Sequence, residues 1–229
     1  MKCANSKCDG EQNSPSGKMP IINQGSPESG GMLSAPLAGS VMRFAGIDWR
    51  VLAVENNKAL LLSEKVLEHR PYDTELVDIT WENCTLRQYL NDDFYNKLGA
   101  EKSAIAETHN ANPNNLWYGT NGGSATTDKI FLLSLEEADK YFGNSGDYIN
   151  KRRKGSSGKT ESSGYRIDTA CNKDRMASYG SKKAWWWLRS PGYSSSRAAD
   201  VGNGGRVDVY GSGVLTALGG VRPALWLNL

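Results

Sequence analysis

Apolar residues first form a regular pattern near residue 41, where they alternate with polar residues or run together, as in β-strands. The pattern predicts strands over residues 41–44, 47–54 and 58–63. Asn56 and Asn57 separate the last two of these runs. A two-residue Asn turn between strand-like runs predicts a β-hairpin.

Residues 1–40 lack such a pattern and are rich in Ser, Gly, Pro and Asn. This composition is typical of a disordered leader or linker, because it offers too little apolar surface to bury. We therefore expect one folded domain over residues 41–229.

The next apolar period is helical and predicts a helix over residues 80–98 that ends at Gly99. A short second helix is expected over 101–108, and the polar stretch 109–127 is expected to be a loop. The buried stripe of the first helix repeats every four residues and consists of Leu86, Leu90, Phe94 and Leu98.

A further apolar run predicts a strand over residues 129–134. Ser134 and Glu137 have the spacing of a capping box, so a short helix should follow directly. The stretch 143–183 is polar and is predicted to be a long insertion. The inner face of the short helix should contain Ala138, Tyr141 and Phe142.

The end of the chain alternates short apolar pieces with Gly-rich turns, which predicts a strand-rich segment and an α+β domain overall. Strand spacing places Trp185 and Trp187 on one side and Trp186 on the other. Arg189 and Arg222 lie at the edges of apolar strands and are predicted to be buried structural arginines. The predicted strands cover residues 185–189, 198–201, 206–209, 213–216 and 221–227.

Charge and hydropathy exclude several classes of function. The net charge of +2 does not indicate nucleic-acid binding, and the basic cluster at 151–154 has no interleaved aromatic residues for stacking. No apolar run reaches about 18 residues, so no membrane insertion is expected. The start of the chain has no signal-peptide pattern, which predicts a cytoplasmic protein by default. Export by another route, to a phage particle or a cell surface, stays open.

The cysteines and histidines give no indication of a metal site. Cys3 and Cys8 have a C-x4-C spacing without a second pair nearby, and Cys84 is predicted to be a buried thiol. No cysteine follows Cys171 and no histidine follows His109. The sequence therefore predicts neither a metal nor a cofactor.

Residues 191–224 have a restricted composition. Lys, Glu, Gln, Met and Trp make up 42 of the 229 residues, so about six would be expected in these 34 positions, and none occurs. Gly-rich turns explain part of this bias. Rigid aromatic ends around a permissive polar filling are typical of a binding surface.

The C-terminal motifs resemble a known family. The series Trp-Trp-Leu-Arg-Ser-Pro-Gly (186–192), Ala-Ala-x-Val (198–201) and Gly-Gly-Val-Arg-Pro-Ala-Leu-Trp (219–226) resembles the C-type-lectin-fold variable proteins of diversity-generating retroelements. Upstream motifs, such as Thr80-Trp81, are similar to a related bacterial domain family of unknown function. The resemblance implies a C-type lectin-like α+β fold with a variable region at about 185–229.

In such families, reverse transcription mutates adenines, chiefly in AAC-type codons, which cannot then encode Lys, Glu, Gln, Met or Trp. The resemblance thus implies a set of variable, ligand-facing residues, which we call the display positions, and a set of fixed residues, which we call the frame. The display positions are Tyr193, Ser194, Ser195, Ser196, Arg197, Asp200, Asn203, Arg206, Asp208, Tyr210, Ser212, Leu215 and Thr216. The frame consists of Trp186, Leu188, Arg189, Ala198, Ala199, Val201, Val207, Val214, Val221, Arg222, Pro223 and Trp226.

The expected function is non-catalytic recognition of an unknown protein or surface ligand. One alternative is a relative of the formylglycine-generating oxidases, which depend on a reactive cysteine pair near the C-terminal core, where this chain has none. Only carboxylates such as Asp200 and Asp208 are left there for catalysis. Another alternative is a carbohydrate-binding lectin of fixed specificity, for which Asp200, Asn203 and Asp208 would supply only some of the calcium ligands. A structural part, such as a component of a tail fibre, is the third.

Overall fold

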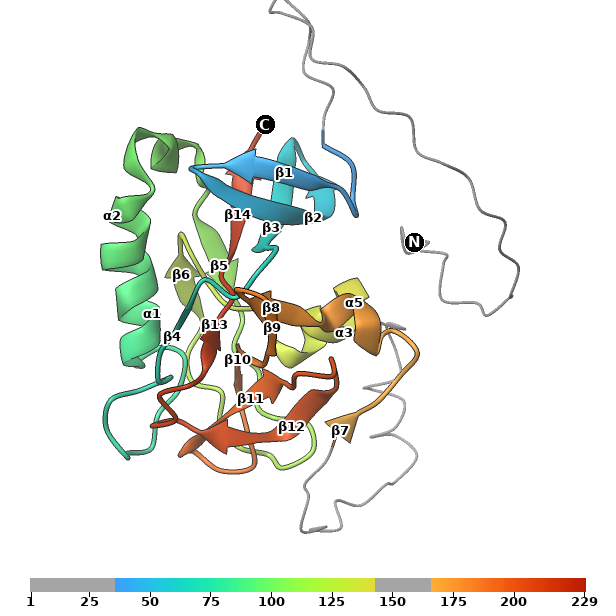
Figure 1. The fold of residues 1–229 in the computed structure, drawn as a ribbon. Helices are drawn as coiled ribbons and strands as arrows, with labels where there is room; N and C mark the ends of the chain where they lie inside the picture. Colours follow the sequence, from blue (N-terminus) through green and yellow to red (C-terminus); the bar gives the residue numbers. More distant parts are fainter. Residues whose placement is uncertain (1–35, 143–165) are drawn as a thin grey trace, which may run out of the picture.

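The computed structural model describes residues 36–142 and 166–229. Their elements form an α+β domain with two main sheets, two small hairpins and short helices (Figure 1). The α+β class is therefore confirmed. Residues 1–35, which include Cys3 and Cys8, and residues 143–165 lie outside the described parts.

The first sheet has the order β1-β2-β3-β14 and is antiparallel throughout. Asn56 and Asn57 have positive φ angles of 51° and 58°, and Glu55 pairs with Lys58 across them. This is the predicted two-residue hairpin, because two successive positive φ angles match the twist of its strands. The strands are β1 (Val41–Phe44), β2 (Ile47–Glu55), β3 (Lys58–Ser63) and β14 (Ala224–Asn228).

The second sheet has the order β4-β13-β10-β11-β12-β7, with one parallel pair, β10 and β13. It lies below the first sheet in Figure 1, with β11 and β12 at its lower front. Residues 213–216, predicted as a strand, instead contain the end of β12 and a turn. The strands are β4 (Glu68–His69), β7 (Arg166–Ile167), β10 (Trp186–Pro191), β11 (Arg197–Val201), β12 (Val207–Gly213) and β13 (Gly220–Val221).

The helix predicted over residues 80–98, which we call the main helix, begins later than predicted, at Thr85. Residues 81–83 form a turn before it, and the Sγ of Cys84 accepts a hydrogen bond from the backbone N–H of Arg87 at 3.4 Å. Its predicted stripe is buried, and Gly99 follows the end with a φ of +67°. None of the helices in the described parts has the length and apolar character needed to cross a membrane. The helical elements are α1 (Thr85–Tyr89), η1 (Leu90–Phe94, a π-helix), α2 (Tyr95–Lys97), η2 (Gly99–Ala104, a 3₁₀-helix), α3 (Leu135–Phe142) and α5 (Asn172–Arg175).

The capping box before α3 is confirmed. The backbone N–H of Ser134 donates to Glu137 Oε2 at 2.9 Å, and the N–H of Glu137 donates to Ser134 Oγ at 3.1 Å. The predicted insertion at 143–183 is wrong in its last part, because residues 166–183 contain β7, α5 and most of a hairpin. That hairpin pairs β8 (Ala177–Tyr179) with β9 (Lys182–Ala184), and β5 (Thr108–Asn110) pairs with β6 (Thr126–Asp128).

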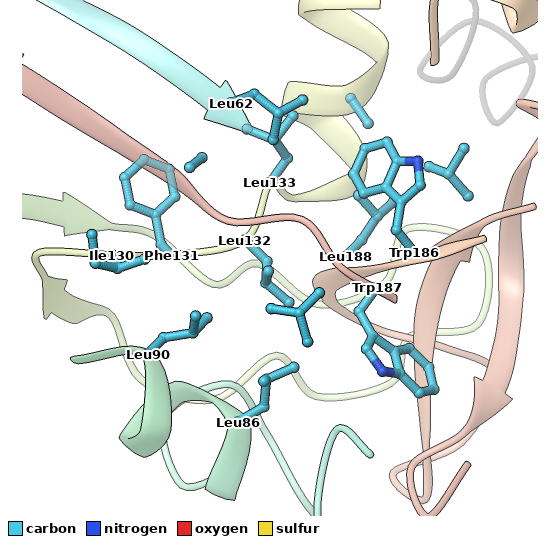
Figure 2. Packing of buried hydrophobic residues seen from close by; sticks show 14 of the residues in the cluster. Leu62, Leu86, Leu90, Ile130, Phe131, Leu132, Leu133, Trp186, Trp187 and Leu188 are labelled. Carbon is cyan, nitrogen blue, oxygen red and sulfur yellow. The ribbon is translucent and has the colours of Figure 1, made fainter. Parts of the chain in front are cut away.

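The core lies between the two sheets and the main helix. Residues 130–133 run through its centre and are fully buried, but they are not the predicted strand (Figure 2). Phe131 makes a single bridge to Ala224 of β14, and the carbonyl of Leu133 accepts the backbone N–H of Arg189. The backbone of this segment thus hydrogen-bonds partly to β14 and partly to β10, so it forms a continuous strand pairing with neither.

Trp186 and Trp187 extend from opposite sides of β10, as strand spacing predicts (Figure 2). The rings of Trp185 and Trp187 meet edge to face at 4.7 Å, while the guanidinium of Arg222 lies 4.9 Å from the Trp186 ring. The tryptophan run is therefore core packing that holds β10 of the second sheet in place.

Candidate functional site

The frame and the display positions differ in burial. Every frame residue is buried except Trp226, which is half-buried. Tyr193, Asn203, Arg206 and Leu215 are exposed, whereas Asp200 is buried with 4% of its surface accessible. The remaining display positions, Ser194, Ser195, Ser196, Arg197, Asp208, Tyr210, Ser212 and Thr216, are half-buried.

The buried arginines of the frame are structural, as predicted. Arg222 is fully buried and donates to the backbone carbonyls of Ser63 at 2.9 Å, Arg175 at 3.3 Å and Glu64 at 3.4 Å. Burial lowers the pKa of Arg222 to about 9, because the charged form loses its water. Arg189 pairs with Glu137 and donates to the carbonyl of Leu132.

A bulge in β12 sets the orientation of the display positions near Tyr210. Ala198 and Asp200 of β11 pair with Ser212 and Asp208 of β12, so β12 has two more residues between the same pairs. Gly211 has a φ of +77°, and a Cβ there would lie 2.3 Å from the carbonyl oxygen of Ala198. The bulge therefore requires glycine at 211 and sets the direction of the neighbouring Tyr210.

Three tyrosines form an aromatic cluster at this bulge, which we call the tyrosine cluster. Tyr193 and Tyr210 stack with ring centres 5.0 Å apart and an interplanar angle of 11°. Tyr118 meets both edge to face, at 5.2 Å and 6.0 Å. The guanidinium of Arg197 lies 4.7 Å from the Tyr210 ring while donating to the carbonyl of Gly211 at 2.7 Å. The cluster combines large rings with a cation, the side chains that contribute most at protein interfaces.

The sequence alone did not identify Tyr118, which lies in the polar loop between β5 and β6. The same loop contributes Thr120, whose Oγ1 donates to the carbonyl of Tyr193 at 2.9 Å. The available signal was the repeated asparagine at 110, 112, 114 and 115, because asparagine side chains fix loop backbone by hydrogen bonds.

The serines at 194–196 are tied to their surroundings more closely than expected for display positions. Ser195 Oγ donates to Asp78, and its carbonyl accepts the N–H of Ile79 at 3.1 Å. The carbonyl of Ser196 accepts the N–H of Val214 at 3.0 Å. The loop is therefore anchored through its backbone. The side-chain hydroxyls of Ser194 and Ser196 hydrogen-bond to each other, with their oxygens 3.1 Å apart.

Asp200 was predicted to face a ligand, and the structure buries it, with 4% of its surface accessible. It occupies the central strand β11, paired with Trp187 on one side and Asp208 on the other. Its carboxylate accepts a hydrogen bond from Ser212 Oγ at 2.8 Å. Burial raises the pKa of Asp200 to about 7, with a smaller contribution from the charge of Asp208 and partial offsets from Ser212 and Arg166.

Asp200 lies at the lining of a polar pocket of about 330 Å³. Residues at this pocket form two ion pairs, between Arg166 and Asp208 at 3.3 Å and between Arg206 and Asp168 at 3.0 Å. Asp208 also accepts the backbone N–H groups of Tyr210 and Gly211, so it stabilises the bulge. The full lining consists of Arg166, Asn172, Asp200, Gly202, Gly204, Arg206 and Asp208.

Comparison with known proteins identifies a family. A family model described as "Domain of unknown function (DUF6273)" matches residues 56–229. The chain belongs to this family. No curated protein and no solved structure gives a significant match. The matched part of the DUF6273 domain begins at the β2–β3 turn, so β1 and β2 precede it and pair with its first strand.

The buried carboxylate of Asp128 has a structural role in this DUF6273 domain. In residues 36–142 and 166–229, no group of three or more His, Cys, Asp or Glu side chains is placed to hold a metal ion. Asp128 is buried and accepts hydrogen bonds from Trp81 at 3.0 Å, Arg87 at 2.6 Å and Asn110 at 2.9 Å. Burial raises the pKa of the Cys84 thiol to about 12, so this cysteine is held as an unreactive thiol.

Proposed function

We propose that this DUF6273 domain is a non-catalytic recognition protein with a C-type lectin-like fold, and that a diversity-generating retroelement varies its display positions. The surface formed by the display positions, which we call the display surface, would bind a protein or another surface ligand. The observation that carries the proposal is the tyrosine cluster with Arg197, set on a strand pair whose frame residues are buried.

The division between frame and display positions supports diversification. A substitution at an exposed or half-buried position changes the free energy of unfolding far less than one in the core. Tyr193 is 43% exposed, whereas Ala198, Val207 and Val214 are at most 1% exposed. The display surface can therefore change while the frame preserves the fold.

The chemistry of the tyrosine cluster favours a macromolecular ligand. Tyr and Arg supply large contact areas with few rotatable bonds, and Ser, Asn and Gly adapt around them, as in antibody binding loops. None of Tyr118, Tyr193, Tyr210 and Arg197 lines the 330 Å³ pocket. Small molecules usually bind in apolar cavities, whereas an aromatic surface outside a pocket suits a protein partner.

The composition of residues 191–224 supports the retroelement in particular. Adenine mutation of AAC-type codons cannot produce Lys, Glu, Gln, Met or Trp, and none of these residues occurs there. A Gly-rich turn explains an excess of small residues but does not explain why Tyr193, Arg197, Arg206 and Tyr210 are present when lysine and glutamate are missing.

Deep sequencing of the locus in a growing population tests the diversification directly. Substitutions should be confined to adenine positions in codons 193–218, with the codons of Trp186, Arg189 and Arg222 unchanged. A nearby reverse transcriptase gene and a near-identical template repeat should accompany them. Invariant codons across the population would contradict the retroelement and leave a binding domain of fixed specificity.

A triple variant, Tyr193→Ala, Arg197→Ala and Tyr210→Ala, tests the binding surface. We expect a loss of about 1 kcal/mol in the free energy of unfolding, from the ring stack and the Arg197 hydrogen bond, together with loss of binding. Circular dichroism melts measure the first effect. Protein, peptide and glycan arrays, with and without calcium, measure the second. A loss of several kcal/mol would mean that these side chains are core and would contradict the proposal.

A further inference from the structure

The loop between β5 and β6 is fastened to the display surface by one buried side chain. Asn115 is 1% exposed, and its amide nitrogen donates to the carbonyls of Pro191 at 2.8 Å and Val209 at 3.2 Å. Its amide oxygen accepts the backbone N–H groups of Trp117 at 2.9 Å and Tyr118 at 3.2 Å. One asparagine thus joins the end of β10 and the bulged part of β12 to the backbone that carries Tyr118.

The loop is also held internally, so it is organised before any ligand arrives. The side-chain amide of Asn112 donates to the carbonyl of Ser124 at 2.7 Å, and Asn114 accepts the N–H of Gly122 at 3.1 Å. A Cβ at Gly122 would lie 2.2 Å from the carbonyl oxygen of Asn112, so the loop closes on itself at this point. A binding residue on such a loop loses little conformational entropy on binding.

Tyr118 is half-buried, and its ring meets the rings of the two display tyrosines edge to face. Residue 118 lies far outside codons 193–218, so diversification of the display positions would leave it unchanged. Replacement of Tyr193 and Tyr210 by small residues would uncover its ring, because those two rings pack against it.

We infer that Tyr118 is a constant binding residue of the display surface and contacts protein ligands in most variants. The inference rests on the proposed function, since it assigns an invariant aromatic anchor to a surface whose other anchors vary. Asn115 positions this anchor. A variant that carries only Ser and Asn at 193 and 210 would still present one large ring at the same place, and one such ring can dominate an interface.

A display library tests the inference. The thirteen display positions are encoded with adenine-mutated AAC-type codons on the otherwise unchanged full chain. The library is selected separately against two unrelated probes, lysozyme and serum albumin. Each enriched clone is then prepared with Tyr118→Ala, with Tyr118→Phe and with Tyr179→Ala. Tyr179 is a matched control, because it is 47% exposed and lies on the β8–β9 hairpin.

Tyr118→Ala should raise the Kd at least tenfold in most clones for both probes. Tyr118→Phe, which keeps the ring, and Tyr179→Ala should change the Kd by less than about threefold. Binding is measured by interferometry well below the melting temperature of each variant, so that a fold defect is separated from a lost contact. Unchanged Kd values for Tyr118→Ala in most clones would overturn the inference and leave the proposed function intact. Failure to enrich any binder would overturn both.

Discussion

The frame and the display surface alternate along the same C-terminal segment, but they use the same residue types in opposite ways. Arg222 is fully buried against three backbone carbonyls, whereas the side chain of Arg206 is 57% exposed and forms one ion pair. Gly219 leaves no room for a Cβ, whereas Gly204 has no neighbour within 4 Å of one. Residue type therefore does not distinguish a structural position from a displayed one. The contacts that each residue makes within the fold do distinguish them.

The largest expected effect is the loss of a frame arginine. Arg222→Ala removes the guanidinium that donates to the carbonyls of Ser63, Glu64 and Arg175 and opens a cavity beside Trp186, so we expect a loss of about 3 kcal/mol or more. Urea unfolding and soluble yield measure it.

Arg206→Ala is the matched control and should cost less than about 0.5 kcal/mol, because its ion pair is exposed to water. Equal losses in the two variants would remove the distinction between frame and display surface. Arg222→Lys should not rescue stability, because one ammonium cannot reach three carbonyls in different directions.

Glycines give a second contrast of intermediate size. A Cβ on Gly219 would lie 1.8 Å from Nε1 of Trp187, which donates to the carbonyl of Arg70 at 2.9 Å. Gly219→Ala should therefore displace the indole and cost about 2 kcal/mol. Gly204→Ala should be nearly neutral. Thermal melts of the two variants test the pair, and a neutral Gly219→Ala would show that the core beside β13 is loosely packed.

A pH-dependent effect sharpens the comparison at Asp200, which belongs to the display positions by sequence and to the frame by burial. Its pKa of about 7 lies above the unfolded value of about 4, so the folded state holds this proton more tightly. Stability contributed by the protonated form is complete below about pH 4 and is lost as pH rises to 7. We expect this loss to reach about 4 kcal/mol at most.

Asp200→Asn cannot ionise, so the stability of this variant relative to the wild type should increase between pH 4 and 7. Urea titrations at several pH values measure that difference. Asp168→Asn, at an exposed ion pair, should change stability by less than about 0.5 kcal/mol throughout. A flat difference for Asp200→Asn would mean that the carboxylate is solvated.

Local signals in the sequence predicted local structure well. The Asn56-Asn57 turn, the Ser134–Glu137 capping box and the four-residue stripe of the main helix each depend on residues close in the chain, and each is present. The burial of the Trp186 and Arg222 regions followed from their apolar surroundings for the same reason.

The predictions that failed concern residues whose structure depends on contacts with segments far away in the sequence. Residues 130–133 have the composition of a strand, but their backbone partners are β14 and β10, and neither runs alongside them for more than one bridge. Asp200 was assigned to the display positions from the resemblance alone, whereas its burial follows from pairing of β11 with both β10 and β12. Tyr118 was missed because the two tyrosine rings that its ring meets, those of Tyr193 and Tyr210, are 75 or more positions away.

The position of β14 after the display positions has a consequence for synthesis. Any stop codon or frameshift between residues 193 and 218 would remove β13 and β14 together. The backbone edge of β3 would then be unpaired, and the core would lack Val221, Leu225 and Leu227. Such a truncated chain exposes apolar surface and a strand edge, which are marks of aggregation and degradation. Folding of residues 36–142 and 166–229 therefore requires a reading frame that is intact through β14.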